Sequence, residues 1–215
     1  RWSMGKFISL EGPEGSGKTT VIQYLSQRLK EDGYDVLITR EPGGIEISEK
    51  IRELILDKNH HQMDAKTEAL LYAASRRQHL VEKVIPALEK GKIVISDRFI
   101  DSSLAYQGVG RAIGVEEVFS INQFAIGDYM PELTLFLDVH PEIGMERVGK
   151  RGEKDRLELE SMLFHQKVYE GYHDLLRAYP DRIKRVDGEQ TLEQVCQDSY
   201  QQVKEFLTHE DESMV

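Results

Sequence analysis

Eight residues near the N-terminus combine glycines, a lysine and a threonine at the spacing of a phosphate-binding loop. The stretch GPEGSGKT, residues 12–19, fits the pattern G-x-x-x-x-G-K-[ST] at every fixed position. Glycines let backbone N–H groups turn toward phosphate oxygens, Lys18 can reach β- and γ-phosphates, and Thr19 offers a hydroxyl to Mg2+. An apolar run precedes the loop and a helical pattern follows it, as the motif requires. The sequence therefore predicts a nucleoside triphosphate site rather than an incidental glycine-rich turn.

A carboxylate ends a second apolar run, IVISD, at residues 93–97. This is the form of a Walker B strand, which would carry Asp97 to the carboxyl end of a parallel sheet, where ligands bind. We expect Asp97 to lie beside the phosphate loop and to support Mg2+ directly or through water. The alternative is that Asp97 caps the following helix.

Arginines follow two of the predicted strands. Arg40 comes after the second strand and Arg98 after the third, while Arg76 and Arg77 lie on a helix otherwise rich in leucine and alanine. Each could be an ordinary surface or salt-bridge residue. Two guanidinium groups at sheet ends, however, can hold a second phosphate by bidentate hydrogen bonds. This pattern favours phosphoryl transfer to an acceptor that is already phosphorylated.

A third basic cluster spans residues 147–156, with five basic residues and two glycines. Such a segment is a poor core element. With a phosphate loop elsewhere in the chain, we interpret residues 149–157 as a short lid that brings arginines onto the transferred phosphate. A solvated charge run is the alternative.

The elements that must position these residues alternate along the chain. Near-continuous apolar runs predict strands at residues 6–11, 35–39, 92–96, 133–138 and 182–187, buried on both faces as in a parallel sheet. Helical patterns separate them, which predicts right-handed crossovers and a doubly wound α/β fold.

Three helical patterns carry further expectations. One predicted face joins Ile47, Ile51, Leu54 and Ile55. In the segment 65–90, Pro86 predicts a kink or a break. A final helix has a stripe of Leu192, Val195, Val203, Phe206 and Leu207 behind a candidate capping box of Thr191 and Gln194.

Composition limits the partners. The 215 residues have 40% hydrophobic and 31% charged side chains and a net charge of −10, which argues against nucleic acid as a partner. Its one cysteine, Cys196, cannot form an internal disulfide, and no apolar run approaches about 20 residues, so we expect a cytoplasmic protein without a membrane partner. We expect a single domain over residues 4–209, with residues 1–3 a remnant of cloning and 210–215 a frayed tail.

Several motifs in order resemble the thymidylate kinase family of P-loop nucleoside monophosphate kinases, over essentially the whole chain from Met4. They are TREPGG at residues 39–44, Thr67-Glu68 leading to SRR at 75–77, and DRFIDSSLAYQG at 97–108. The resemblance implies a three-layer α/β/α P-loop NTPase fold, with a five-stranded parallel sheet and a mobile lid. It implies transfer of phosphate from ATP to dTMP with Mg2+, feeding dTTP synthesis, and a homodimer.

The resemblance also assigns residues to ligands. It assigns ATP to Gly12, Pro13, Glu14, Gly15, Ser16, Gly17, Lys18, Thr19, Thr20 and Arg147. It assigns dTMP to Glu11, Arg40, Glu41, Arg52, Tyr72, Arg76, Arg98, Ser102, Ser103, Tyr106 and Gln107. It places Mg2+ at Thr19 and Asp97, and catalysis at Lys18, Asp97, Arg98, Arg151 and Arg156.

Within the acceptor site, the resemblance implies that Tyr72 lies against the thymine face, with Arg76, Ser103 and Gln107 at its edge. Tyr106 would lie by the deoxyribose. The variable positions of the phosphate loop, residues 13–16, contain no arginine. In this family the catalytic arginine then comes from the lid, so Arg151 and Arg156 are the candidates, as in the bacterial lid-arginine type.

Other functions stay open at this point. The same scaffold could serve a kinase for a nucleoside or for another monophosphate. A P-loop ATPase or switch protein is a rival of a different class, although the N-K-x-D signature typical of GTPases does not occur. Residues 115–126, with Val118, Phe119, Asn122 and Ala125 at helical spacing, could form an interface or pack into the core.

Overall fold

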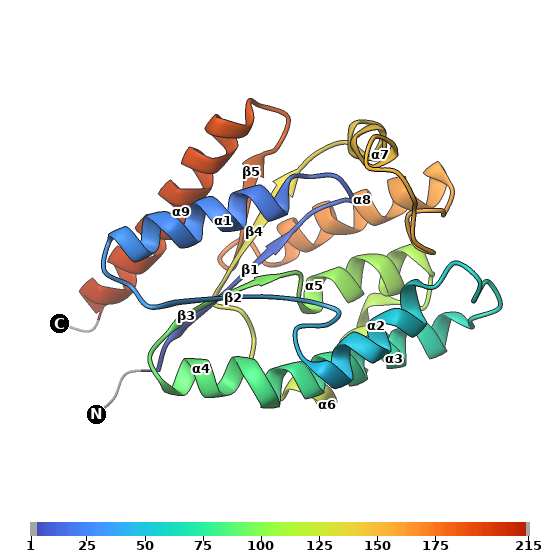
Figure 1. The fold of residues 1–215 in the computed structure, drawn as a ribbon, viewed down its shortest axis with the longest axis horizontal. Coiled ribbons are helices and arrows are strands. Elements are labelled where there is room, and N and C mark those ends of the chain that lie inside the picture. Colours follow the sequence, from blue (N-terminus) through green and yellow to red (C-terminus); the bar gives the residue numbers. More distant parts are fainter. Residues whose placement is uncertain (1–3, 214–215) are drawn as a thin grey trace.

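The computed structural model describes residues 4–213, which form a parallel sheet between two layers of helices (Figure 1). The sheet has the strand order β2-β3-β1-β4-β5. Its strands are β1 (Lys6–Glu11), β2 (Val36–Arg40), β3 (Ile93–Asp97), β4 (Leu133–Asp138) and β5 (Ile183–Asp187). The predicted strands are therefore confirmed, with a shift of one residue at β2 and β3 and a later start for β5.

Both faces of the sheet are covered, as the apolar runs predict. On β1, Phe7 packs toward one hydrophobic cluster, whereas Ile8 and Leu10 pack toward another. Successive strand side chains point to opposite faces, so a continuous apolar run is what a sheet buried on both sides needs.

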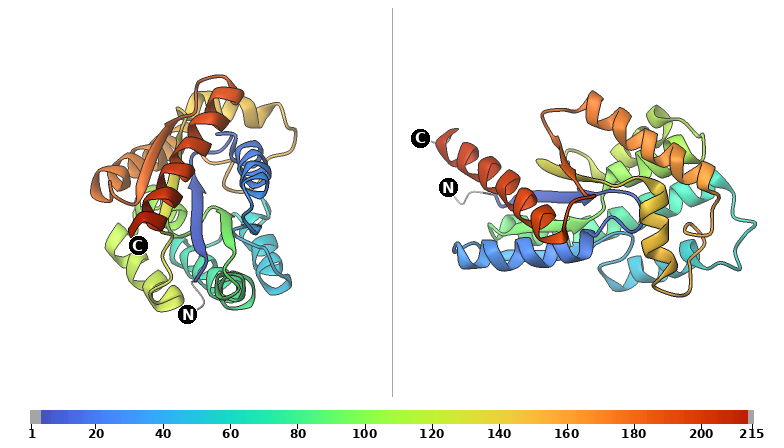
Figure 2. Two further views of the ribbon diagram at one scale, coloured as in Figure 1. Left: turned by 90° about the vertical axis from the view of Figure 1, so that its left-hand side faces the viewer. Right: turned by 90° about the horizontal axis from the view of Figure 1, so that it is seen from above.

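The helices divide between these two faces (Figures 1 and 2). On one face lie α1 (Lys18–Glu31) and α9 (Leu192–Ser213). On the other lie α3 (Ala65–His79), α4 (Ile85–Glu89), α6 (Val115–Ile126), α8 (Met162–Ala178) and the π-helical segments η1 (Leu80–Val84) and η2 (Leu104–Gly110). The helices α2 (Glu46–Leu56), α5 (Ile100–Ser103) and α7 (Pro141–Gly149) lie near the carboxyl ends of the strands.

Pro86 does not break the segment 65–90. The chain stays helical through α3, η1 and α4, and the wider π turn of η1 lies directly before Pro86. Proline has no N–H to donate to the preceding turn, and a π turn is one way in which a helix accommodates that loss.

Two of the predicted helix faces and the capping box differ in the structure: Leu192 of the α9 stripe, for example, is exposed. In α2, Ile55 is buried and Ile51 packs against the core, but Ile47 and Leu54 are exposed. The capping box before α9 is half formed: Thr191 Oγ1 accepts from the backbone N–H of Gln194, whose side chain turns to Asp198 instead.

The last helix extends further than the sequence predicts. Glu210–Ser213 continue α9, and Lys6 Nζ donates to Glu210 Oε2 at 3.2 Å, which ties this end of the helix to β1. The remaining expectation of a frayed tail falls on residues 214–215, and the cloning remnant on residues 1–3, both outside the described residues. Among residues 4–213, none of the helices is long and apolar enough to cross a bilayer.

Candidate active site

The phosphate loop connects β1 to the first turn of α1. Gly15 and Gly17 have φ angles of +76° and +91°, which side chains other than glycine rarely adopt. A Cβ at Gly15 would also lie 2.1 Å from the carbonyl oxygen of Gly144 in α7. Ser16 Oγ is buried without a hydrogen-bond partner among the described residues. The loop conformation therefore requires glycine at these positions, and the Ser16 hydroxyl is available to a ligand.

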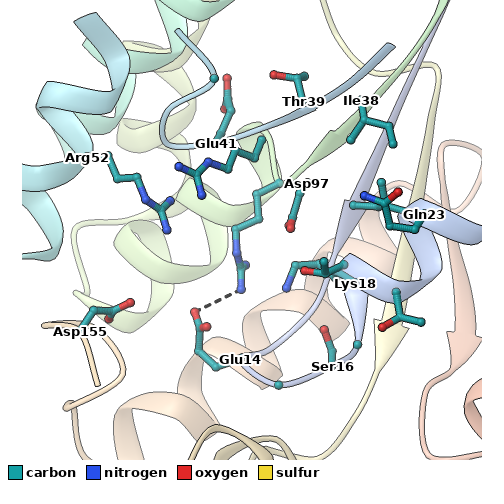
Figure 3. Close-up of a pocket in the computed structure, with 18 of the residues that line it drawn as sticks. Glu14, Ser16, Lys18, Gln23, Ile38, Thr39, Glu41, Arg52, Asp97 and Asp155 are labelled. Carbon is teal, nitrogen blue, oxygen red and sulfur yellow. Dashed lines mark hydrogen bonds and ion pairs between the residues drawn. The ribbon is translucent and has the colours of Figure 1, made fainter. Parts of the chain in front are cut away.

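A cavity of about 1030 Å³ adjoins this loop, at the upper end of the range for ligand pockets. We call it the larger cavity. Lys18, Glu14 and Asp97 reach into it from different elements (Figure 3). Of the residues assigned to ATP and catalysis, it is lined by Glu14, Gly15, Ser16, Gly17, Lys18, Thr19, Thr20, Asp97, Arg98, Arg147 and Arg151. Gly12, Pro13 and Arg156 do not line it.

The sheet register brings the predicted strand-end residues together. Asp97 pairs with Leu10 of β1 on one side and with Arg40 of β2 on the other. The three strands therefore end at the same level, directly before the phosphate loop. Asp97 contributes no cap to the helix that follows it, so its position favours the ligand role over the capping role.

The groups around Lys18 fit a hard cation. The Thr19 hydroxyl and the Asp97 carboxylate line the same cavity as Lys18, and oxygen ligands are those that Mg2+ prefers. No group of three or more histidine, cysteine, aspartate or glutamate side chains in residues 4–213 is placed to hold a metal by itself. Mg2+ usually takes few protein ligands and completes its shell with phosphates and waters.

A smaller cavity opens beside the larger one and shares residues with it. It is lined by Glu14, Glu41, Pro42, Arg52, Leu56, Tyr72, Arg76, Arg98, Ser102, Tyr106, Gln107, Asp155 and Leu157. Most of the residues assigned to dTMP are in this set. Tyr72 and Tyr106 provide aromatic walls, and Arg52 and Arg98 are the basic side chains that line both cavities.

Arg98 is held at the junction of the two cavities. Its backbone has an unusual φ of +71°. Its guanidinium donates to Ser102 Oγ at 3.0 Å and to Tyr172 Oη at 2.9 Å, and to Glu14 Oε1 at 3.2 Å. Burial opposes ionisation of Glu14, but the positive charges of Arg98 and Lys18 outweigh it and lower the pKa of that carboxyl. A fixed cation thus faces the phosphate loop.

Arg40 lines the larger cavity but lies in an ion pair. Its guanidinium donates to both carboxylate oxygens of Glu49, at 2.9 Å each, and Glu49 also accepts from the backbone N–H of Gly44. Glu49 is not among the residues predicted from the sequence. The sequence feature that could have indicated Glu49 is its place as an acidic residue in the first turn of the helix that follows TREPGG.

Of the two residues predicted at the base edge together with Gln107, Arg76 lines the smaller cavity and Ser103 does not. Arg76 is 2% exposed. It donates to Glu41 Oε1 at 2.7 Å, to Ser103 Oγ at 2.9 Å and to Asn122 Oδ1 at 2.5 Å. Ser103 lines neither cavity. The guanidinium of Arg76 therefore reaches the wall of the smaller cavity and also fixes Glu41 and α6.

Glu41 is part of a buried network rather than a free ligand. Besides Arg76, it contacts His79 Nδ1 at 2.7 Å, and His79 Nε2 lies 2.6 Å from Thr39 Oγ1. His79 is fully buried and was missed, because its partners are separated from it by about forty residues of sequence. This network fixes the turn after β2.

Glu11 lies behind the site and lines neither cavity. Its carboxylate accepts from the Phe99 backbone N–H at 2.7 Å, from Tyr172 Oη at 2.8 Å and from Ser102 Oγ at 2.5 Å. The predicted contact of Glu11 with dTMP is therefore replaced by a positioning role: it fixes the turn that carries Arg98.

The predicted lid arginines have different surroundings. Arg147 donates to the carbonyl oxygen of Gly15 at 3.1 Å, and Arg151, with a side chain 63% exposed, pairs with Glu158 at the wall of the larger cavity. Arg156 instead donates to Glu68 and to the carbonyl oxygen of Ile55. Because these acceptors lie on α2 and α3, Arg156 is not directed at the phosphate loop, contrary to the prediction.

Known proteins share this fold and much of this sequence. The family model for thymidylate kinase matches residues 10–199. The thymidylate kinase of Oceanobacillus iheyensis is 56% identical over 209 residues, 96% of this chain and 93% of that protein. That of Clostridium novyi is 57% identical over 205 residues, 94% of this chain and 98% of that protein. The crystal structure of thymidylate kinase from Ehrlichia chaffeensis superposes with a TM-score of 0.76 at 31% identity, covering 94% of this chain and 99% of that one. The chain belongs to the thymidylate kinase family.

Proposed function

We propose that this member of the thymidylate kinase family transfers the γ-phosphate of ATP to dTMP across the junction of the two cavities. ATP binds along the phosphate loop in the larger cavity, and dTMP binds in the smaller one. The observation that supports this arrangement is that Arg52 and Arg98 line both cavities. A phosphate on either substrate can therefore reach the same two guanidinium groups.

The reaction needs no covalent intermediate with the protein. An oxygen of the dTMP phosphate is the nucleophile, and the bond from the γ-phosphorus to the bridging oxygen of ATP breaks. The protein holds two anions in line and neutralises their repulsion. Lys18 binds the ATP phosphates and Arg98 binds the acceptor phosphate. Arg151 contacts the transferred group when the predicted lid, which lies in the loop between α7 and α8 at residues 150–161, closes.

Mg2+ is the expected metal. The Thr19 hydroxyl and the Asp97 carboxylate are the protein groups that would hold it, directly or through water. When bound, Mg2+ supplies positive charge to the phosphate oxygens. Asp97 is held in position because β3 is paired with a strand on each side.

The base end of dTMP fits the aromatic part of the smaller cavity. Tyr72 offers a flat apolar surface, and Gln107 offers an amide at its side. Tyr106 donates its hydroxyl hydrogen to Glu14 Oε1 at 3.1 Å, so its ring is held near the phosphate end, where a sugar would lie. Arg76 lines the same cavity and is held in place by Glu41.

A homodimer is supported by exposed apolar side chains on and near α6, but not by the residues named from sequence. Val118, Asn122 and Ala125 of α6 are buried in the core. The opposite side of α6 exposes 94% of Phe124, and the adjoining helices α3 and η1 expose Leu70 and Val81. Large apolar groups exposed on neighbouring helices are candidates for an interface. Sedimentation of the wild type and of Phe124→Asp tests this, and we expect the variant to be a monomer.

The single cysteine, Cys196, is buried. Because a single cysteine cannot form an internal disulfide, the composition supports a reducing, cytoplasmic location.

A coupled ADP-release assay tests the reaction. ATP and Mg2+ are supplied with dTMP, dUMP, dCMP, thymidine or no acceptor. We expect ADP release that depends on dTMP and exceeds the release with each of the others. Release with thymidine but not with dTMP would indicate a nucleoside kinase and remove the phosphate role of Arg98. Equal release without an acceptor would indicate an ATPase.

A further inference from the structure

Glu68 is a buried carboxylate beneath the smaller cavity. It lies on α3, one helical turn before Tyr72, and is 1% exposed. It does not line either cavity. Its oxygens accept hydrogen bonds from Gln107 of η2, from Arg111, and from Arg156 at the end of the loop at 150–161. Three segments that surround the cavity thus meet on one side chain.

The surroundings of Glu68 keep it ionised. Burial opposes ionisation, but hydrogen bonds from Arg111 and the positive charge of that guanidinium outweigh it and lower the pKa of Glu68. An ionised carboxylate can only accept hydrogen bonds, and a guanidinium can only donate them. The partner of Glu68 on Gln107 must therefore be the side-chain NH2 group, and Nε2 lies 2.9 Å from Glu68 Oε2.

This contact decides which end of the Gln107 amide is free. With Nε2 committed to Glu68, Oε1 is the remaining polar atom, and it is buried without a hydrogen-bond partner among the described residues. Gln107 lines the smaller cavity. A buried acceptor without a partner is costly and gains from a ligand N–H.

We propose that Glu68 is a positioning residue for specificity, which orients the Gln107 amide so that the base site presents an acceptor and selects a pyrimidine with a ring N–H. The inference rests on the proposed binding of dTMP in the smaller cavity. Thymine carries such an N–H at ring position 3. Cytosine has a lone pair there, which would face the Gln107 oxygen and leave both acceptors unpaired. A site built on a hydrogen bond rejects a base that lacks the matching group.

The substitution Glu68→Gln tests the inference. The new side-chain amide can accept from Arg111 with its oxygen and turn its NH2 toward Gln107, which lets the Gln107 amide rotate and present its own NH2 to the cavity. We expect the ratio of kcat/KM for dTMP to that for dCMP to fall about tenfold or more, the order of one hydrogen bond. KM for dTMP should rise and KM for ATP should stay unchanged.

Glu160→Gln is the matched control. Glu160 accepts from the other side of Arg111, at 2.6 Å from Nη1, and has no contact with Gln107. The Glu160→Gln substitution removes a negative charge from the same arginine, Arg111, so we expect an unchanged ratio of kcat/KM for dTMP to that for dCMP. A folded Glu68→Gln protein with the wild-type ratio would overturn the inference, as would an equal fall of the ratio in the control.

Glu68→Asp is the second variant if Glu68→Gln does not fold, because it keeps the charge for the arginines and withdraws the oxygens from Gln107. A smaller fall in the same ratio is expected, and no fall would overturn the inference.

The wild-type protein gives an independent readout by NMR. The Gln107 NH2 hydrogens should exchange slowly with solvent, and exchange as fast as in an exposed glutamine would contradict the contact. Wild-type protein that does not phosphorylate dTMP at all would instead overturn the proposed function.

Discussion

Arg98 and Glu14 form an ion pair between the end of β3 and the phosphate loop, with Nη2 and Oε1 3.2 Å apart. Both residues line both cavities. The dashed line at Glu14 in Figure 3 marks this ion pair. The cation that we assign to the acceptor phosphate is thus tied to the loop that we assign to ATP. We expect this contact to hold the Arg98 guanidinium in place between the two substrates.

Arg98→Lys should weaken the acceptor site far more than the ATP site. Lysine keeps the charge but loses the planar fork that contacts Ser102 and Glu14 simultaneously. We expect kcat/KM for dTMP to fall about 10²-fold or more, the scale of losing one positioned donor, with KM for ATP within a factor of about three. Steady-state kinetics measures both. The control is Arg28→Lys, on α1, where Arg28 lies over the Tyr200 ring. If dTMP kinetics stay at wild-type values, Arg98 does not bind the acceptor.

The arginines of the loop at 150–161 should separate into one catalytic and one structural residue. Arg151→Ala should reduce kcat by about 10³-fold, as loss of an arginine at a transferred phosphate does in related reactions, with little effect on unfolding. Lys150→Ala, at an exposed neighbouring position, is the control and should be neutral. Wild-type turnover by Arg151→Ala would exclude it from catalysis.

Arg156→Ala should act on stability instead. It removes a buried partner of Glu68, so we expect the free energy of unfolding in urea to fall by about 3 kcal/mol. If the variant unfolds like the wild type but turns over slowly, Arg156 reaches the phosphates after all and its packing against Glu68 is not the relevant state.

Tyr72→Ala should raise KM for dTMP and leave KM for ATP unchanged. The ring lines only the smaller cavity, and stacking of a base on an aromatic side chain contributes about 1–3 kcal/mol, so a rise of about tenfold or more is expected. Tyr24→Ala on α1, whose ring packs against Tyr200, is the control. An unchanged KM for dTMP in Tyr72→Ala would move the base out of this cavity.

Glu11 should make stability fall as pH rises through neutrality. Burial raises the pKa of Glu11 from its usual value of 4.5 to about 7. Between these two values the folded state holds a proton that the unfolded state has released, so this group's stabilisation is full below pH 4.5 and is lost as pH rises to about 7. Glutamine at this position cannot titrate.

The comparison between wild type and Glu11→Gln isolates this effect. Urea unfolding at several pH values should show that the advantage of the wild type over the variant shrinks from about pH 5 to about pH 8. An advantage that grows with pH would mean that the donors around Glu11, namely the Phe99 N–H, Ser102 and Tyr172, hold its pKa low instead.

The sequence was sufficient for the sheet and the phosphate loop, because both depend on local patterns. The strands are continuous apolar runs, and the loop pairs glycine geometry with Lys18 and Thr19 at fixed spacing. Asp97 could be placed because the carboxyl ends of parallel strands share one edge of the sheet, and its register with Leu10 and Arg40 confirms that placement.

The partners of the arginines could not be predicted in the same way. Arg76 and Glu41 are 35 residues apart in sequence, and Arg156 and Glu68 are 88 apart. Tertiary packing decides which carboxylate a guanidinium contacts over such distances. The sequence around Arg76 and Arg156 therefore did not show whether each arginine binds a ligand or pairs with a buried carboxylate. The sequence also did not show which side of α6 is exposed. That depends on which side packs against α3, and this is again set by tertiary packing.

A structure of the protein with a non-hydrolysable ATP analogue, Mg2+ and dTMP is the most direct test of the two-cavity arrangement. We predict triphosphate along residues 12–19, the dTMP phosphate within hydrogen-bond distance of Arg98, and the base against Tyr72. A dTMP phosphate that binds away from Arg98, or a triphosphate outside the phosphate loop, would contradict the account.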